Sequence, residues 1–199
     1  KTGKIDDLVG ASKIENDAFV SNISSAGQII VRPWSTTTQI GTIKDGELTN
    51  LVSLGNDLAI GCGDWHPTQN RLVTIFTPVD GSISSYSTVA LLWAEAGSRP
   101  TILFYYKDYI GWKPCPRWSR DGKSIFIGEH NVLFEMEIAS SEIKTIAENV
   151  DSEFSISPNG EWIVYSSDSA VYIQNLESAE KYKILDRYYS PIVWTDWLE

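Results

Sequence analysis

The two histidines, His66 and His130, have the clearest potential for catalysis in this chain of 199 residues. A histidine works as a general base when a nucleophilic Ser or Cys lies within hydrogen-bond reach, and no such residue is placed beside either histidine. His66 stands between a Trp and Pro67, as expected in a turn, and His130 precedes Asn131 in an expected hairpin. We therefore predict a capping or turn role for His66 and a solvated turn position for His130.

The two cysteines, Cys62 and Cys115, each lie three residues before a Trp, at Trp65 and Trp118. Equivalent positions on neighbouring strands diverge from a common axis, whereas a disulfide needs Cα atoms within about 7 Å of each other. We expect two free, buried thiols, with a disulfide as the alternative. A zinc site is less favoured because neither histidine stands at a usual ligand spacing, and the sequence predicts no metal and no cofactor.

The charge balance is acidic, with 26 Asp and Glu against 16 Lys and Arg and a formal net charge of −10. Binding to a nucleic-acid backbone needs clustered Lys and Arg, so we expect no nucleic-acid partner. No run of about 18 apolar residues occurs, so we expect no membrane insertion. The carboxylates are scattered along the chain, and we interpret them as solvated loop acids. A carboxylate pair acting on a sugar is the alternative.

Aromatic side chains offer a different chemistry, because rings with a polar tip make good contact surfaces for peptides, sugars or protein partners. They gather near two long segments, 78–87 and 107–114, and in a third segment near the end of the chain. The candidate binding residues are Tyr86, Tyr105, Tyr106, Tyr109, Trp112, Tyr188 and Tyr189. In the alternative for Tyr105 and Tyr106, one ring packs in the core and the other shields a sheet edge.

These residues are positioned by a repeated unit, clearest in 118–127 and 156–165, where a polar turn closed by Gly separates two apolar segments. Further copies begin at Ile23 and Trp65, and a partial copy begins at Trp194. The residues that follow the Trp or Ile are spaced by 42, 53, 38 and 38 positions, at Ser24, His66, Ser119, Ser157 and Thr195. A period near 40 with four β-segments per unit is typical of propeller blades.

The sequence therefore predicts an all-β fold, a β-propeller of four-stranded antiparallel blades. About four blades are complete, roughly 18–54, 59–106, 115–149 and 152–187, with partial strands at 1–9 and 192–199. In the last blade we expect strands at 152–157, 161–166, 170–176 and 180–186. The recurring Trp65, Trp118 and Trp194 should pack between blades as core residues. Because the partial strands would close a ring with exposed edges, we expect a segment of a larger propeller, completed by further blades of the parent chain or of another chain. A single, self-contained propeller domain is the alternative.

The turns of the two regular units, residues 119–123 and 157–161, each lead into an apolar strand. They resemble TolB-type propeller repeats and, more distantly, WD repeats. The resemblance covers most of the chain, but its motif is architectural and carries over no catalytic residue. It implies a protein-binding platform of the bacterial envelope, a gating domain beside a serine peptidase, or part of a larger surface protein. It slightly favours a periplasmic or extracellular location.

The function favoured by the sequence is a non-catalytic interaction platform for a protein or peptide, with carbohydrate as a further ligand class. Binding is expected on the long loops of the second blade, because long loops on a rigid repeat usually carry function. One alternative is a propeller domain of a glycan- or peptide-processing hydrolase, or a gating domain beside a peptidase. No Gly-x-Ser-x-Gly elbow occurs in the chain, so the peptidase itself is excluded from these residues. The other alternative is an assembly element completed by another chain.

Overall fold

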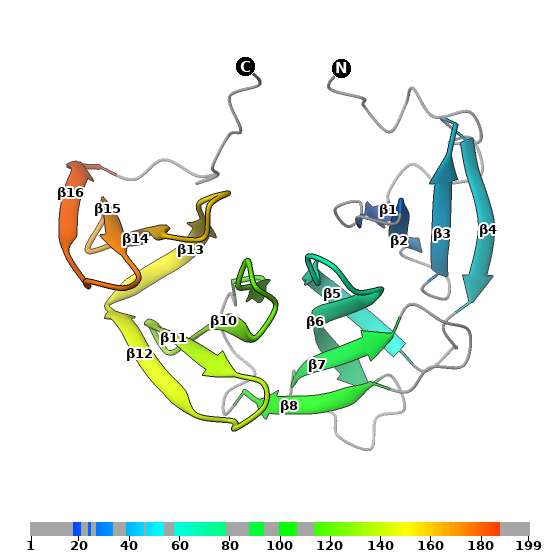
Figure 1. The fold of residues 1–199 in the computed structure, drawn as a ribbon, viewed down its shortest axis with the longest axis horizontal. Helices are drawn as coiled ribbons and strands as arrows, with labels where there is room; N and C mark the ends of the chain where they lie inside the picture. The colour runs from blue at the N-terminus through cyan, green and yellow to red at the C-terminus, as the bar shows by residue number, and fades with distance from the viewer. Residues whose placement is uncertain are drawn as a thin grey trace. The chain divides into compact units, whose positions relative to one another are not determined.

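Four antiparallel sheets of four strands each make up the described part of the computed structural model (Figure 1). The structure describes residues 18–20, 24, 27–33, 39–45, 47–53, 58–78, 88–93, 100–106 and 114–187. No helix occurs within these ranges, so the predicted all-β class is confirmed for them. The chain divides into two units, residues 1–109 and 110–199, which we describe separately.

The first unit holds two sheets, which we call blades 1 and 2. Blade 1 consists of β1 (Ala18–Val20), β2 (Gln28–Pro33), β3 (Gln39–Lys44) and β4 (Glu47–Ser53). Blade 2 consists of β5 (Leu58–Trp65), β6 (Arg71–Pro78), β7 (Thr88–Trp93) and β8 (Thr101–Tyr105). In each sheet the strands lie side by side in chain order, which is the antiparallel arrangement expected of a propeller blade.

The second unit holds blades 3 and 4 in the same arrangement. Blade 3 consists of β9 (Arg117–Trp118), β10 (Ser124–Glu129), β11 (Val132–Glu137) and β12 (Ile143–Glu148). Blade 4 consists of β13 (Val150–Ile156), β14 (Trp162–Ser167), β15 (Ala170–Asn175) and β16 (Lys181–Leu185). The strands of blade 4 begin and end within two residues of the predicted positions.

The turn between the first two strands of a blade is built around one serine. In blade 4, the Ser157 hydroxyl accepts a hydrogen bond from Trp162 N (2.9 Å) and donates to Asn159 Oδ1 (2.6 Å). In blade 3, Ser119 makes the equivalent bonds with Ser124 N and Asp121 Oδ1. Gly160 closes the blade 4 turn at a φ of +74° and with its Cα facing Arg120 of blade 3, where a Cβ would lie 2.8 Å from the Arg120 Cβ. Both features favour glycine.

His66 occupies the serine position of the equivalent turn in blade 2. Its Nδ1 accepts hydrogen bonds from Thr68 N (3.1 Å) and Gln69 N (3.0 Å), and the residue is only 5% exposed. The imidazole therefore satisfies backbone donors that would otherwise be unpaired. The predicted capping role of His66 is confirmed.

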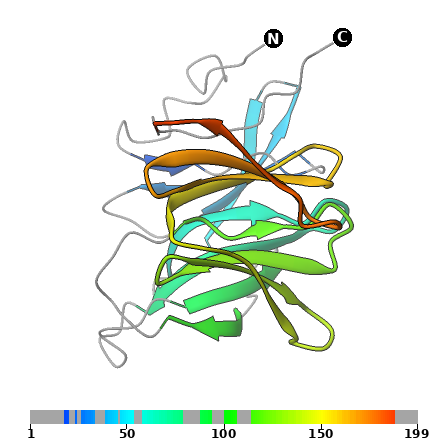
Figure 2. The ribbon, with the colours of Figure 1, turned by 90° about the vertical axis from the view of Figure 1, so that its left-hand side faces the viewer.

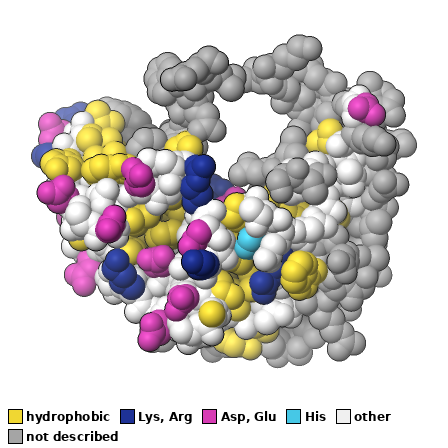
Figure 3. Space-filling model, in the orientation of Figure 1, with side chains coloured by type: hydrophobic (Ala, Val, Ile, Leu, Met, Phe, Trp, Pro, Cys, Tyr) yellow, Lys and Arg dark blue, Asp and Glu magenta, His cyan; other side chains and the backbone are white. Residues whose placement is uncertain are grey.

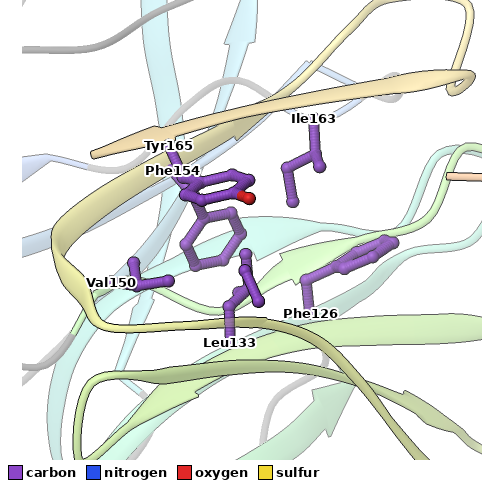
Figure 4. Packing of buried hydrophobic residues seen from close by; sticks show 7 residues of the cluster. Phe126, Leu133, Val150, Phe154, Ile163 and Tyr165 are labelled. Carbon is purple, nitrogen blue, oxygen red and sulfur yellow. The ribbon is translucent and has the colours of Figure 1, made fainter. Parts of the chain in front are cut away.

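The hydrophobic core of the second unit lies between blades 3 and 4 (Figure 4). Figure 2 shows blade 4, in yellow to red, lying above blade 3, in green to yellow. The core cluster consists of Phe126, Leu133, Ala147, Val150, Phe154, Ile163 and Tyr165. Trp65 and Trp118 are 6% and 4% exposed, which confirms their predicted place in the core, whereas Trp194 lies outside the described residues.

The expectation of free thiols is wrong, because Cys62 and Cys115 are both disulfide-bonded. The expectation assumed that both cysteines occupy equivalent positions on diverging first strands. Cys62 does lie within β5, but Cys115 precedes the two-residue strand β9 and belongs to no strand. The divergence of neighbouring strands therefore does not restrict its position.

Candidate binding surface

Two of the seven predicted binding residues, Tyr105 and Tyr106, lie in the part of the chain that the structure describes. The other five lie outside the described residues: Tyr86, Tyr109, Trp112, Tyr188 and Tyr189. Tyr105 is the last residue of β8, and Tyr106 follows it directly. Successive side chains of an extended chain point in opposite directions, so these two tyrosines have different surroundings.

Tyr106 is not part of a binding surface, which corrects the prediction. Its side chain is fully buried, and its ring makes an edge-to-face contact with Phe104, with 5.6 Å between the ring centres and 84° between the ring planes. Such a contact stabilises the blade. Burial of this ring makes Tyr106 a core residue.

Tyr105 is 56% exposed. In the sheet it pairs with Thr88, the first residue of β7. The segment between β6 and β7 therefore ends beside Tyr105, at the same end of blade 2 where the chain leaves β8.

Large exposed apolar side chains concentrate on the outer strands of blades 2, 3 and 4. The residues concerned are Ile102 and Tyr105 on β8, Ile143 on β12, and Tyr182, Ile184 and Leu185 on β16. Trp93, at the end of β7, is also 45% exposed, and the Arg71 Cζ lies 5.2 Å from the centre of its ring. Aromatic residues and arginine are the side chains that contribute most to protein interfaces. Among the described residues, exposed apolar side chains thus lie mainly on the outer strands.

The remaining candidates for acid–base chemistry are His130 and the carboxylates of the described residues. His130 is exposed, and with Asn131 it forms a turn in which both residues have positive φ (49° and 61°), as predicted for a solvated hairpin position. The acidic side chains on the face shown in Figure 3 are dispersed among other residues. Within the described ranges, no group of three or more His, Cys, Asp or Glu residues could hold a metal ion. The described ranges hold no helix that is long and apolar enough to cross a bilayer.

Tyr165 has a pKa far above the ordinary value of a tyrosine. Burial raises the pKa of Tyr165 to about 12, with a smaller contribution from the neighbouring Tyr172. Its hydroxyl donates to Gln174 Oε1 at 2.9 Å. The group therefore stays protonated near neutral pH and serves as a structural hydrogen-bond donor.

Comparison with known proteins identifies the fold but no family. No protein-family model matches the chain, and no curated protein matches its sequence. One similar solved structure is a crystal structure of a nidogen/laminin complex, with a TM-score of 0.61 and 7% identity over 87% of this chain. Another is an oligogalacturonate lyase in complex with manganese, with a TM-score of 0.59 and 11% identity over 83% of this chain. The fold is of the β-propeller type.

At these identities the similarity extends to the fold alone. The chain covers 66% of the matched chain in the nidogen/laminin complex and 51% of the lyase. The four-stranded antiparallel sheets of blades 1 to 4 are of the kind found in propellers. A propeller is a scaffold that carries unrelated functions on different surfaces, so function has to be argued from the exposed residues.

Proposed function

We propose that this chain is a non-catalytic β-propeller that acts as an interaction platform for a protein or peptide. The observation that carries the proposal is the exposure of Tyr105 at the end of blade 2 from which its long segments extend. The proposed surface is built on Tyr105, with Tyr86 and Tyr109 of the same unit as further contact residues. Trp112, Tyr188 and Tyr189 belong to the second unit and are proposed as binding residues there. Tyrosine and tryptophan supply large contact areas with a polar tip, as protein-binding surfaces require.

Two further observations support the proposal. The serine-centred turns of blades 3 and 4 are consistent with the TolB-type repeat, whose relatives include protein-binding platforms. One propeller of similar structure was crystallised in a protein complex, that of nidogen and laminin. Binding rather than catalysis is the function for which the described surface offers residues.

The test is a peptide array probed with the fluorescently labelled chain. Peptides that bind the unchanged chain are then measured against the variants Tyr105→Ser and Trp112→Ser. We expect each variant to raise the Kd at least tenfold, equivalent to about 1.4 kcal/mol. The matched control is Ile143→Ser, because Ile143 on β12 is 55% exposed, like Tyr105 at 56%. This control should leave the Kd within about twofold.

The proposal fails if the two aromatic variants bind every selected peptide as well as the control does. It also fails if the chain turns over glycan or peptide substrates in a generic screen and one Asp or Glu substitution abolishes that turnover. The second result would make the chain an enzyme domain. An oligosaccharide array run in parallel would show whether the same surface takes carbohydrate.

A further inference from the structure

A groove of about 490 Å³ opens between β12 of blade 3 and strands β14 to β16 of blade 4. One wall is the stretch of chain from Thr145 to Asn149, and the other includes Tyr165, Gln174 and Lys181. Every residue that lines it belongs to the second unit. Its volume falls in the range of known ligand sites. Its lining residues belong to blades 3 and 4, whereas the long loops of the proposed function belong to blade 2.

Hydrogen bonds fix the two walls of the groove against each other. Tyr165 donates its hydroxyl proton to Gln174 Oε1, and Gln174 Nε2 in turn donates to the Ile146 carbonyl at 3.2 Å. Further along, the Ser167 hydroxyl lies 3.4 Å from the Glu148 carbonyl that accepts its proton. Tyr165 itself is fully buried in the core cluster of Figure 4. The groove therefore has a rigid base, and a ligand would not have to order it.

At one end of the groove, the Lys181 ammonium is held over aromatic rings. Its Nζ lies 4.0 Å from the centre of the Tyr172 ring and 5.2 Å from that of Tyr165. No carboxylate among the described residues pairs with it, whereas Lys183, two positions along β16, pairs with Asp186 at 2.7 Å. Lys181 is exposed, so its ammonium can receive an anion from solvent.

The opposite end of the groove is negative, with the carboxylates of Glu148 and Asp168. Lys181 pairs with Gln174 at the first end, and Asp168 lies in the turn before Ala170 at the second. The Lys181 ammonium lies over the Tyr172 ring, and the two steps from Ala170 to Tyr172 span roughly 7 Å of extended chain. The groove thus separates positive from negative charge by about the length of two extended residues.

We infer that this groove binds an extended segment of a partner protein that carries an acidic and a basic side chain about two residues apart, on the same side of the segment. The carboxylate of the segment pairs with Lys181, and its cation pairs with Glu148 and Asp168. Charge complementarity at both ends fixes the direction of the bound segment, and the buried base of the groove packs against its middle residues. The inference rests on the proposed role of the chain as a protein-binding platform and adds a second site with a defined partner chemistry.

The test uses the full chain and a peptide array of defined charge spacing. One set of eight-residue peptides carries Asp and Lys two residues apart, with the remaining positions randomised. A second set has the two charges adjacent, and a third has Asn and Gln in their place. We expect the first set to give the strongest binders, with a Kd at least tenfold lower than that of the matched uncharged peptides.

Variants of the protein then locate the site. Lys181→Gln should weaken binding of the selected peptides at least fivefold, and Lys181→Arg should restore part of it. Lys183→Gln is the matched control, since Lys183 lies on the same strand but is already paired with Asp186, and it should change the Kd less than twofold. Amide resonances of Ser167, Gln174 and Lys181 should shift on titration with a selected peptide.

Each other outcome overturns the inference. It fails if charged and uncharged peptides bind equally, if Lys181→Gln and Lys183→Gln have equal effects, or if the shifted resonances lie elsewhere. Shifts of the groove resonances that depend on protein concentration, without peptide, would identify a second copy of the chain as the occupant and would also overturn it. If Lys181→Gln has no effect while Tyr105→Ser abolishes binding, only this inference fails and the proposed function stands.

Discussion

The strands β14 and β16 belong to one sheet and are separated only by β15, yet their surroundings are opposite. Every residue of β14 from Ile163 to Ser167 is buried, whereas all five residues of β16 are exposed. β14 contributes Ile163 and Tyr165 to the core between the blades, and β16 presents Tyr182 to the surroundings at 51% exposure. Within one blade, burial and exposed apolar surface are therefore assigned to different strands.

Blade 3 shows the same division. The residues of β10 from Ser124 to Gly128 are buried, and most of β12 is exposed. Because apolar burial is the main favourable term in folding, the inner strands should determine stability. The outer strands can vary their side chains at little cost, so they are suited to carry the contacts that differ from one propeller to another.

The largest predicted effect contrasts two isoleucines in blade 4. Ile163 on β14 is fully buried, and Ile184 on β16 is 51% exposed. Ile163→Ala should lower the free energy of unfolding by about 2 to 5 kcal/mol, because it leaves a cavity in the core. Ile184→Ala should change it by no more than about 0.5 kcal/mol. Urea unfolding of both variants under one set of conditions provides the measurement.

Equal losses of stability in the two isoleucine variants would contradict the claim that the inner strands determine stability. That result would mean that β16 is covered in solution, by another molecule or by another part of the chain. Repeating the measurement at several protein concentrations separates these explanations, because only a covering molecule makes the stability depend on concentration.

The division between inner and outer strands could be predicted from the sequence only in part. Strand positions follow from local signals, such as the turn that Ser157 and Gly160 form between two apolar segments. The strands of blade 4 accordingly lie within two residues of their predicted positions. The burial of Tyr106 rather than Tyr105 could not be predicted. Alternation assigns two adjacent tyrosines to opposite faces, but the register shift between β7 and β8 changes which face points inward.

The groove could not be predicted at all, because it depends on packing between blades. Glu148 and Lys181 line the same groove but stand 33 positions apart in the sequence, on outer strands of different blades. Periodicity identifies each blade but does not specify the side chains that meet across two of them. The aromatic contacts of Lys181 arise from the β15–β16 register, which includes a shift between Val171 and Tyr172.

The second prediction contrasts two serines in turns of blade 4. Ser157 lies in the turn between β13 and β14, is 7% exposed, and accepts a hydrogen bond from Trp162 N. Ser157→Ala leaves that N–H without its side-chain acceptor and should cost about 1 to 3 kcal/mol. Ser178 lies in the exposed turn before β16 and accepts from Glu180 N at 3.3 Å. Ser178→Ala should cost no more than about 0.5 kcal/mol, as judged by thermal and urea unfolding.

If the two serine variants lose equal stability, burial is not what distinguishes the turns. His66→Ser tests the role of the turn residue in blade 2, because His66 occupies the serine position and accepts hydrogen bonds from two backbone N–H groups. A serine there should retain most of the stability, and His66→Ala should lose more than His66→Ser does. The reverse order would show that the imidazole makes contacts that the serine turn cannot replace.

The third prediction contrasts the hydroxyl groups of two tyrosines. Tyr165 donates to Gln174 Oε1 at a buried site, and Tyr182 donates to Glu180 Oε2 at an exposed one. Tyr165→Phe should cost about 1 kcal/mol. Tyr182→Phe should have an effect within about 0.5 kcal/mol. A loss from Tyr182→Phe that matches the loss from Tyr165→Phe would contradict the assignment of stability to the inner strands.

The pH dependence of these two variants provides an independent measurement. The pKa of Tyr165 is raised by burial from 10.0 to about 12, so the folded state retains this proton more strongly than the unfolded state. The resulting stabilisation is fully present below pH 10 and is lost as the pH rises toward 12. Between these values the wild type should lose more stability than Tyr165→Phe does. Tyr182→Phe should follow the wild type.

The smallest expected effect concerns the ion pair on the outer strand. Lys183 Nζ lies 2.7 Å from Asp186 Oδ1, but the side chains are 52% and 86% exposed. The hydrogen bond from Lys183 lowers the pKa of Asp186 below 3.8, so any stabilisation is present above that pH and is lost as the pH falls through the lowered value. Solvent and salt screen such a pair. We therefore expect the urea midpoint of Asp186→Asn to equal that of the wild type at pH 7 in physiological salt. A loss as large as that of Ser157→Ala would show that β16 is held by interactions comparable to those of β14, and the distinction between inner and outer strands would fail.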